Sequence, residues 1–297
     1  MLIATPNASW REWLKENLGG RDLLLLDPAD ANHGPAGRLC LIRGDRVVAW
    51  RFYGSLDPQR APHVLIAAAT AMATEDAVVQ LFSYSPTPLL RHLAILLAQL
   101  LRPQEILMEA GGEIDQEGWP VGPQDLELPP AFPAMVQAAQ RKANWIGLME
   151  ACEPHELDLD KVSFEGSRLG SGIRLRDPFL VRDLPEALYA EQTGSTLFVV
   201  AQGDIEEARM SRALDHYHCS RAVIAHTEWY ENLLCSFARQ DGEDFGYGIV
   251  ERIDFRRGVV CARTTAVPPA PVRILRLGSL QVGPSGEELG ELKPWQV

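Results

Sequence analysis

The chain has 297 residues and a formal net charge of -12, with 46% hydrophobic and 23% charged residues. These proportions are ordinary for a globular protein, and the length allows one large domain or two modest ones. The acidic balance disfavours general binding to the phosphate backbone of nucleic acids, unless basic residues gather locally.

The cysteines and the lengths of the apolar runs favour the cytoplasm as the compartment of this protein. Five cysteines are scattered along the chain without a C-x-x-C pair, which is typical of reduced thiols rather than of a disulfide framework. No apolar run reaches the ~18 residues of a membrane span, and residues 1–6 do not resemble a signal peptide. We therefore expect a cytoplasmic protein without membrane contact, and the sequence leaves its oligomeric state open.

Strand and helix signals alternate over the first part of the chain. Continuous apolar runs predict buried strands, and apolar residues at helical spacing predict the helices between them. We expect strands at 1–4, 23–26, 38–53 (two strands around a turn at 43–46), 78–82 and 105–109, and helices at 10–17, 62–75 and 88–101. This alternation predicts an α/β fold with a mainly parallel sheet flanked by helices.

The chain changes character after residue 110. Glycine and proline are frequent over 110–131, which predicts a linker-like segment, and a helix is expected over 134–152. Short strands then predominate, at 196–201, 222–226, 233–237, 247–253, 259–264 and 272–277, with a helix beginning near 205. We therefore expect two domains, an α/β domain over 1–200 and a smaller β-rich C-terminal domain over 201–297.

Two carboxylates, Asp27 and Asp30, follow the predicted strand at 23–26. Ligands bind at the carboxyl ends of strands in α/β sheets, and acids there can hold Mg²⁺. The alternative is a purely local role, because Asp-Pro followed by Asp is a good turn former. Asp27 and Asp30 are thus the candidate catalytic residues, and Asp27 is a weak candidate for a magnesium ligand.

A phosphate-binding loop requires glycines, whose N–H groups face the phosphates, and a lysine that reaches the terminal phosphate. Residues 4–12 contain neither, and Pro6 removes a backbone donor. The helix expected after this segment can still bind an anion at its N-terminus. The candidate phosphate ligands here are Thr5, Asn7, Ser9 and Arg11; the alternative is an ordinary turn in which Ser9 caps the helix.

Three further segments have a chemical interpretation beside a structural one. The glycine-rich segment 166–172 contains Arg168 but no lysine, which favours a tight loop over a phosphate cradle. The histidine and cysteine residues between 216 and 226 match no well-defined zinc spacing. Arginines gather over 168–182 and 252–276, which predicts either paired surface charge or a local surface for RNA.

Taken in order, these segments resemble the polynucleotide 5′-hydroxyl kinase family, the RNA kinases. The landmarks that match are Asp27, then Gly34-Pro35-Ala36-Gly37 and Leu39-Cys40-Leu41-Ile42, Gly54-Ser55-Leu56-Asp57-Pro58, 83–86, 102–107, 248–254 and 277–280. The matches are collinear over nearly the whole chain. The resemblance implies a P-loop-NTPase-like sheet and, in the family, a site for ATP and Mg²⁺.

The departures from the family pattern fall on the phosphate site. The phosphate-loop lysine and glycines are absent, and Ala29, Ala31 and Asn32 replace the second acid, the glycine and the glutamine of the acidic segment. Arg141 and Lys142 are the candidates for the family's lid arginines. The resemblance therefore implies a degenerate member.

Three functions are consistent with this pattern. The first is a non-catalytic or weakly active relative of RNA 5′-kinases that acts as a binding or assembly module for RNA or a protein partner. The second is an active polynucleotide kinase or NTPase that uses ATP and Mg²⁺, with Asp27 and Asp30 on the metal and Arg141 or Arg168 on phosphate. The third is a subunit whose phosphate loop comes from a partner chain.

Overall fold

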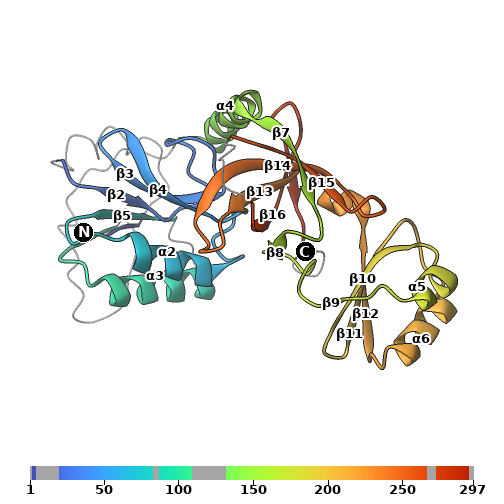
Figure 1. Cartoon of the computed structure of the whole chain (residues 1–297). Helices are drawn as coiled ribbons and strands as arrows, with labels where there is room; N and C mark the ends of the chain where they lie inside the picture. Colours follow the sequence, from blue (N-terminus) through green and yellow to red (C-terminus); the bar gives the residue numbers. More distant parts are fainter. Residues whose placement is uncertain (1, 5–19, 83–86, 109–131, 266–271, 294–297) are drawn as a thin grey trace. The chain divides into compact units, whose positions relative to one another are not determined.

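The computed structural model describes residues 2–4, 20–82, 87–108, 132–265 and 272–293, which form a mixed α/β structure with three sheets (Figure 1). The chain divides into two compact units, Met1–Trp145 and Ile146–Val297. Among the described residues, no helix combines the length and apolarity that crossing a membrane would need.

The first unit contains a six-stranded sheet in the order β4-β3-β2-β5-β1-β6. Its strands are β1 (Leu2–Ala4), β2 (Leu23–Leu25), β3 (Arg38–Arg43), β4 (Arg46–Phe52), β5 (Val78–Leu81) and β6 (Ile106–Met108). The pairings β2–β5, β5–β1 and β1–β6 are parallel, whereas β2–β3 and β3–β4 are antiparallel. The sheet is therefore mixed: the tight turn at Gly44-Asp45 folds β3 and β4 into a hairpin, and β3 joins this hairpin antiparallel to β2.

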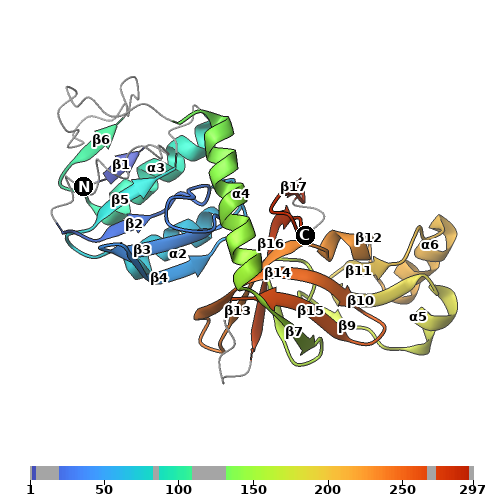
Figure 2. The same ribbon diagram turned by 90° about the horizontal axis from the view of Figure 1, so that it is seen from above.

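Two helices, α2 (Pro62–Met72) and α3 (Pro88–Leu101), cover one face of this sheet, as both views show (Figures 1 and 2). Each begins with proline. The N–H of a first helical residue has no acceptor within the helix, so the absence of this group in proline costs nothing there. Their leucines and alanines pack with those of β2 and β5 in one core. Leu24 and Leu26 are fully buried in that core, as the continuous apolar run at 23–26 predicts.

The second unit contains two sheets. One has the order β17-β16-β13-β14-β15-β7, with β8 paired to β16, and the other has the order β12-β11-β10-β9. The strands are β7 (Glu153–Asp158), β8 (Ser163–Glu165), β9 (Ile173–Arg174), β10 (Ala187–Thr193), β11 (Thr196–Ala201), β12 (Arg221–His226), β13 (Leu233–Ala238), β14 (Asp244–Asp254), β15 (Val259–Thr264), β16 (Ile274–Val282) and β17 (Glu288–Glu291). Residues of both sheets share one core, and α5 (Pro178–Asp183) and α6 (Glu207–His216) pack on the four-stranded sheet with a second core.

The division between the units lies further toward the N-terminus than the boundary at 200/201 expected from composition. It lies inside the helix α4 (Ala134–Ala151), between Trp145 and Ile146. The reason is strand pairing: β7 pairs with β15, β8 with β16, and β11 with β12, so the chain from 153 to 201 folds with the strands of the C-terminal part. The C-terminal unit is consequently no smaller than the first one.

Candidate functional site

The acidic loop that follows β2 is built by its own side chains. The N–H of Ala29 donates to the Asp27 carboxylate at 3.0 Å, and the N–H of Asn32 donates to the Asp30 carboxylate at 2.8 Å. The N–H of Gly37 closes the loop on the Pro28 carbonyl at 2.7 Å. Each aspartate thus organises the backbone two residues ahead of it, which is the turn chemistry that the sequence predicts.

The side chain of Asp30 is buried and already surrounded by donors. The Asn32 side-chain amide donates to it at 2.9 Å, and the Gln80 amide, from the neighbouring strand β5, donates at 3.3 Å. His33 Nδ1 lies 3.6 Å from its Oδ1. Since these contacts occupy both carboxylate oxygens, Asp30 holds the loop to the sheet rather than facing a ligand.

Asp27 differs from Asp30 because it is buried with few donors. Its side chain is almost completely buried, and among the described residues the N–H of Ala29 is the donor that it accepts from. Burial, with a smaller contribution from the charge of Asp30, raises the pKa of Asp27 to about 7, although the Ala29 N–H and the Arg141 charge oppose this. A large fraction of Asp27 is therefore protonated at neutral pH.

The amides of α4 close the other side of the loop. Gln140 Nε2 donates to Asn32 Oδ1 at 3.0 Å, and Asn144 Nδ2 donates to the carbonyls of Ala31 at 2.5 Å and Gly34 at 3.0 Å. These bonds tie the helix to the loop across more than 100 residues of sequence. Amide side chains therefore cover the carboxyl end of β2, where a ligand would be expected in an α/β sheet.

A small hollow separates the acidic loop from α4. Its volume is about 30 Å³, and its lining consists of Asp27, Ala29, Asp30, Ala31, Asn32, Gln137 and Gln140. This space suits one or two water molecules, not the phosphates of a nucleotide. Within the part of the chain that the structure describes, no group of three or more histidine, cysteine or acidic side chains is arranged to hold a metal ion.

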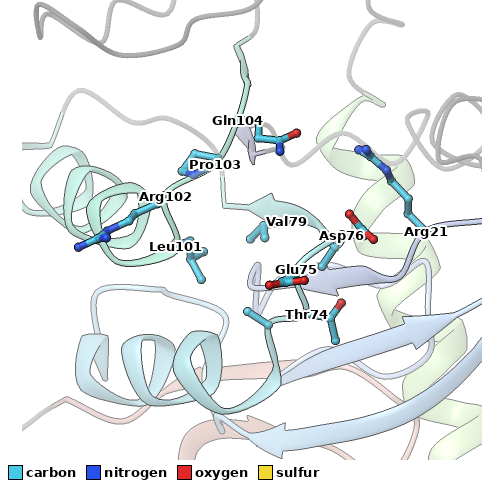
Figure 3. Close-up of a pocket in the computed structure, with 11 residues that line it drawn as sticks. Arg21, Thr74, Glu75, Asp76, Val79, Leu101, Arg102, Pro103 and Gln104 are labelled. Carbon is cyan, nitrogen blue, oxygen red and sulfur yellow. The ribbon is translucent and has the colours of Figure 1, made fainter.

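A larger cavity of about 220 Å³ lies at the opposite, amino ends of the strands (Figure 3). Figure 3 shows the carboxylates of Glu75 and Asp76 beside it, with the guanidinium groups of Arg21 and Arg102 on different sides. Lining charges of both signs face solvent there. Because α/β sheets bind ligands at the carboxyl ends of strands, the acidic loop is the better candidate site.

The other predicted site residues fall in three places. Thr5, Asn7, Ser9 and Arg11 lie outside the described residues. Arg141 lies in the first unit, close enough for its charge to lower the pKa of Asp27. Arg168 lies in the second unit, in the glycine-rich segment 166–172. The structure thus brings Arg141 near Asp27.

The backbone of the glycine-rich segment 166–172 binds a carboxylate of the protein itself, the side chain of Glu191. Both carboxylate oxygens of Glu191 accept from the N–H of Gly170 at 3.0 Å, and one of them accepts from Gly172 at 3.2 Å. The Tyr189 hydroxyl donates to the same carboxylate. Burial raises the pKa of Glu191, and these donors oppose that effect. Sequence reasoning missed Glu191, because nothing in a strand of seven residues marks one acid as buried.

Two glycines of this segment are required by close packing. A Cβ on Gly172 would lie 2.7 Å from the carbonyl oxygen of Gln192, and one on Gly170, whose φ is +81°, would lie 2.8 Å from Phe164 Cβ. The segment is therefore a tight loop, as we expected from a glycine-rich sequence that contains no lysine.

Among known proteins, this chain is similar to solved structures but not to any family model or curated sequence. Two solved structures of a Clp1p–Pcf11p complex are similar to this chain, each at 9% identity, covering 94% of this chain and 74% of theirs, with TM-scores of 0.48 and 0.49. One of them also concerns the loss of ATP in a point mutant of that protein. Likeness at this level supports no statement about activity.

Several arginines of the second unit that might have faced RNA are paired with acids. Arg174 and Arg176 both contact Asp160, and Arg276 contacts Asp244 and Glu165. Two histidines of the 216–226 cluster contact aromatic rings: His216 stacks on Phe179, and His226 meets Trp229 edge to face. These contacts agree with paired surface charge and give no support to a metal site in that cluster.

Proposed function

We propose that this chain is a non-catalytic or weakly active relative of the RNA 5′-hydroxyl kinases, with a P-loop-like core, that acts as a binding or assembly module. The collinear sequence landmarks support the relationship, and so does the run of parallel strands β2-β5-β1-β6 within the mixed sheet. The partner that we propose is a protein rather than RNA, because the net charge is -12 and several arginines of the second unit, among them Arg176 and Arg276, are paired with acids.

The state of Asp27 carries the proposal. Phosphoryl transfer depends on cations that neutralise the phosphates and on groups that position them. A hard cation such as Mg²⁺ binds ionised oxygen ligands and must displace their protons. With a pKa of about 7, Asp27 keeps its proton in about half of the molecules at pH 7, and its hollow of about 30 Å³ leaves no room for a phosphate between the described residues. The acidic segment therefore serves as framework.

Calorimetry tests the proposal on the full chain. We expect no heat of binding for Mg²⁺–ATP at micromolar to millimolar concentrations, and no transfer of labelled γ-phosphate to RNA with a 5′-hydroxyl. Micromolar binding would contradict the proposal. If binding is seen, Asp27→Asn and the exposed Asp76→Asn distinguish a role of the acidic loop from a general effect of charge, because Asp76 lies at the opposite ends of the strands.

The proximity of Arg141 to Asp27 favours a second candidate function, an active kinase or NTPase with an unorthodox site. In that arrangement Asp27 and Asp30 hold Mg²⁺ and Arg141 contacts a phosphate. It requires Asp27 to lose its proton and α4 to release the loop. RNA phosphorylation that falls in both Asp27→Asn and Arg141→Gln, but not in Lys142→Gln, would establish this function instead.

A further inference from the structure

The strand β12 forms an open edge of the four-stranded sheet. It pairs with β11 on one side, and no strand or loop of the described chain hydrogen-bonds to its other side. In a parallel pair, every second residue bonds to the neighbouring strand. The N–H of Arg221 donates to the Ser195 carbonyl, so the alternate residues Ala222 and Ile224 direct their N–H and C=O groups outward, and His226 directs its N–H outward. The C=O of His226 accepts the first bond of the 3-10 helix Thr227–Tyr230.

This edge lacks the features that normally prevent edges from pairing. The edge strand β7 of the other sheet carries Pro154 and three exposed acids, Glu153, Glu156 and Asp158, and β9 has only two residues. In β12, by contrast, neither proline nor a charged side chain occurs between Arg221 and the end of the strand. Its central residues are alanine, valine and isoleucine, and they are mostly half-buried.

Apolar surface continues on both faces of β12 up to its open side. Ala222 and Ile224 pack against the core under α5 and α6, and Val223 packs against the core shared by the two sheets of this unit. Each of these three side chains is partly exposed. An added strand would therefore bury apolar side chains on both faces and pair the outward backbone groups at the same time.

The charges at the two ends of β12 favour pairing with the β12 strand of a second copy, in the antiparallel orientation. Arg221 stands at the start of the strand, and Glu228 follows its end. An antiparallel copy with Ile224 on the twofold axis places Ala222 opposite His226 and brings each arginine end to the other copy's glutamate end. Both segments then bond through their outward residues, and like charges do not meet.

From these features we propose that a second copy of this chain adds its β12 antiparallel to the first, which joins the two four-stranded sheets into one across a twofold axis. The interface is independent of the acidic loop and of the function proposed for it. It assigns the protein a homodimeric state that composition leaves open.

Sedimentation and light scattering of the full chain over a range of concentrations test the proposal. We expect the mass to rise to twice that of a single chain. Arg221→Glu and Glu228→Arg should each weaken the dimer at least tenfold, and the double variant should restore it. Arg182→Glu, an arginine on the exposed surface of α5, is the matched control and should leave the mass unchanged.

Amide exchange provides a readout that a folding defect would not imitate. The N–H groups of Ala222, Ile224 and His226 should gain protection as the concentration rises, while amides that already bond to β11 should not change. Ala222→Pro deletes one outward donor without touching the bonds to β11, and it should give a folded monomer. A monomer at every concentration, or a dimer unaffected by Ala222→Pro and by the charge reversals, would overturn the proposal.

Discussion

Substituting Asp27 by asparagine isolates the electrostatic cost of the buried carboxylate. Asparagine keeps the size of the side chain and the oxygen that accepts from Ala29, and it removes the charge. The pKa of Asp27 is about 7 in the fold against an ordinary value of 3.8, so folding favours the protonated form. The wild type therefore has its full stability below about pH 4, loses stability as the pH rises to about 7, and changes little above that.

The size of the effect follows from the two pKa values. A difference of about three, at ~1.4 kcal/mol for each pH unit, gives a cost of about 4 kcal/mol for the ionised carboxylate. D27N should thus unfold like the wild type near pH 4 and be more stable by up to about 4 kcal/mol at pH 8.

Amide exchange in the first unit is a suitable assay, since the chain has two units and their global unfolding need not be a single transition. The N–H of Leu26 donates to the Gln80 carbonyl at 2.8 Å beside Asp27 and reports the opening of this sheet. The exchange rate of this amide in the wild type, divided by its rate in the variant, should grow between pH 4 and pH 7 and then level off. A ratio that is constant with pH, or a variant that opens more readily at pH 8, would refute the reasoning by showing that Asp27 is ionised and paired.

Three further substitutions have definite outcomes, each measured by urea unfolding of the unit concerned. Asn144→Ala leaves two loop carbonyls without their donor and should destabilise the first unit by about 1–3 kcal/mol, whereas Gln137→Ala, whose amide bonds at the surface, should change it by less than about 0.5. Gly248→Ala places a Cβ against a β15 carbonyl and should cost about 1–3 kcal/mol or more, while Gly147→Ala, in open helix surface, should stabilise by about 0.5–1. Asp244→Asn removes the buried partner of an arginine and should cost about 3–5 kcal/mol. Equal stabilities within any of these comparisons would contradict its explanation.

Local patterns predicted most elements of the fold. The helix at 88–101 and the strands at 196–201 and 259–264 have the bounds expected from the sequence. In each, proline, glycine or a two-residue turn ends the pattern close to its last residue. The hairpin at 38–53 follows for the same reason, because its turn chemistry is local.

The elements that escaped prediction depend on distant partners. β7 reads Glu-Pro-His-Glu-Leu-Asp, which is neither apolar nor rich in β-branched residues, and it becomes a strand by pairing with β15 about 100 residues later. The division into compact units between Trp145 and Ile146 depends on the same distant pairings. At the site, the sequence indicated Asp27 and Asp30, but the amides of Gln140 and Asn144 that cover them were unrecognisable, since no local pattern links a helix to a loop that far away.

The carboxylate of Glu191 in the loop 166–172 has a consequence for experiments with added anions. An anion attached to the same chain acts at an effective concentration that a dissolved competitor reaches with difficulty. Phosphate or sulfate in a crystallisation or assay buffer should therefore neither occupy this loop nor order it. A glycine-rich segment of this kind resembles a nucleotide site in sequence. In the folded chain, however, Glu191 already occupies the N–H groups of Gly170 and Gly172 that could bind a phosphate.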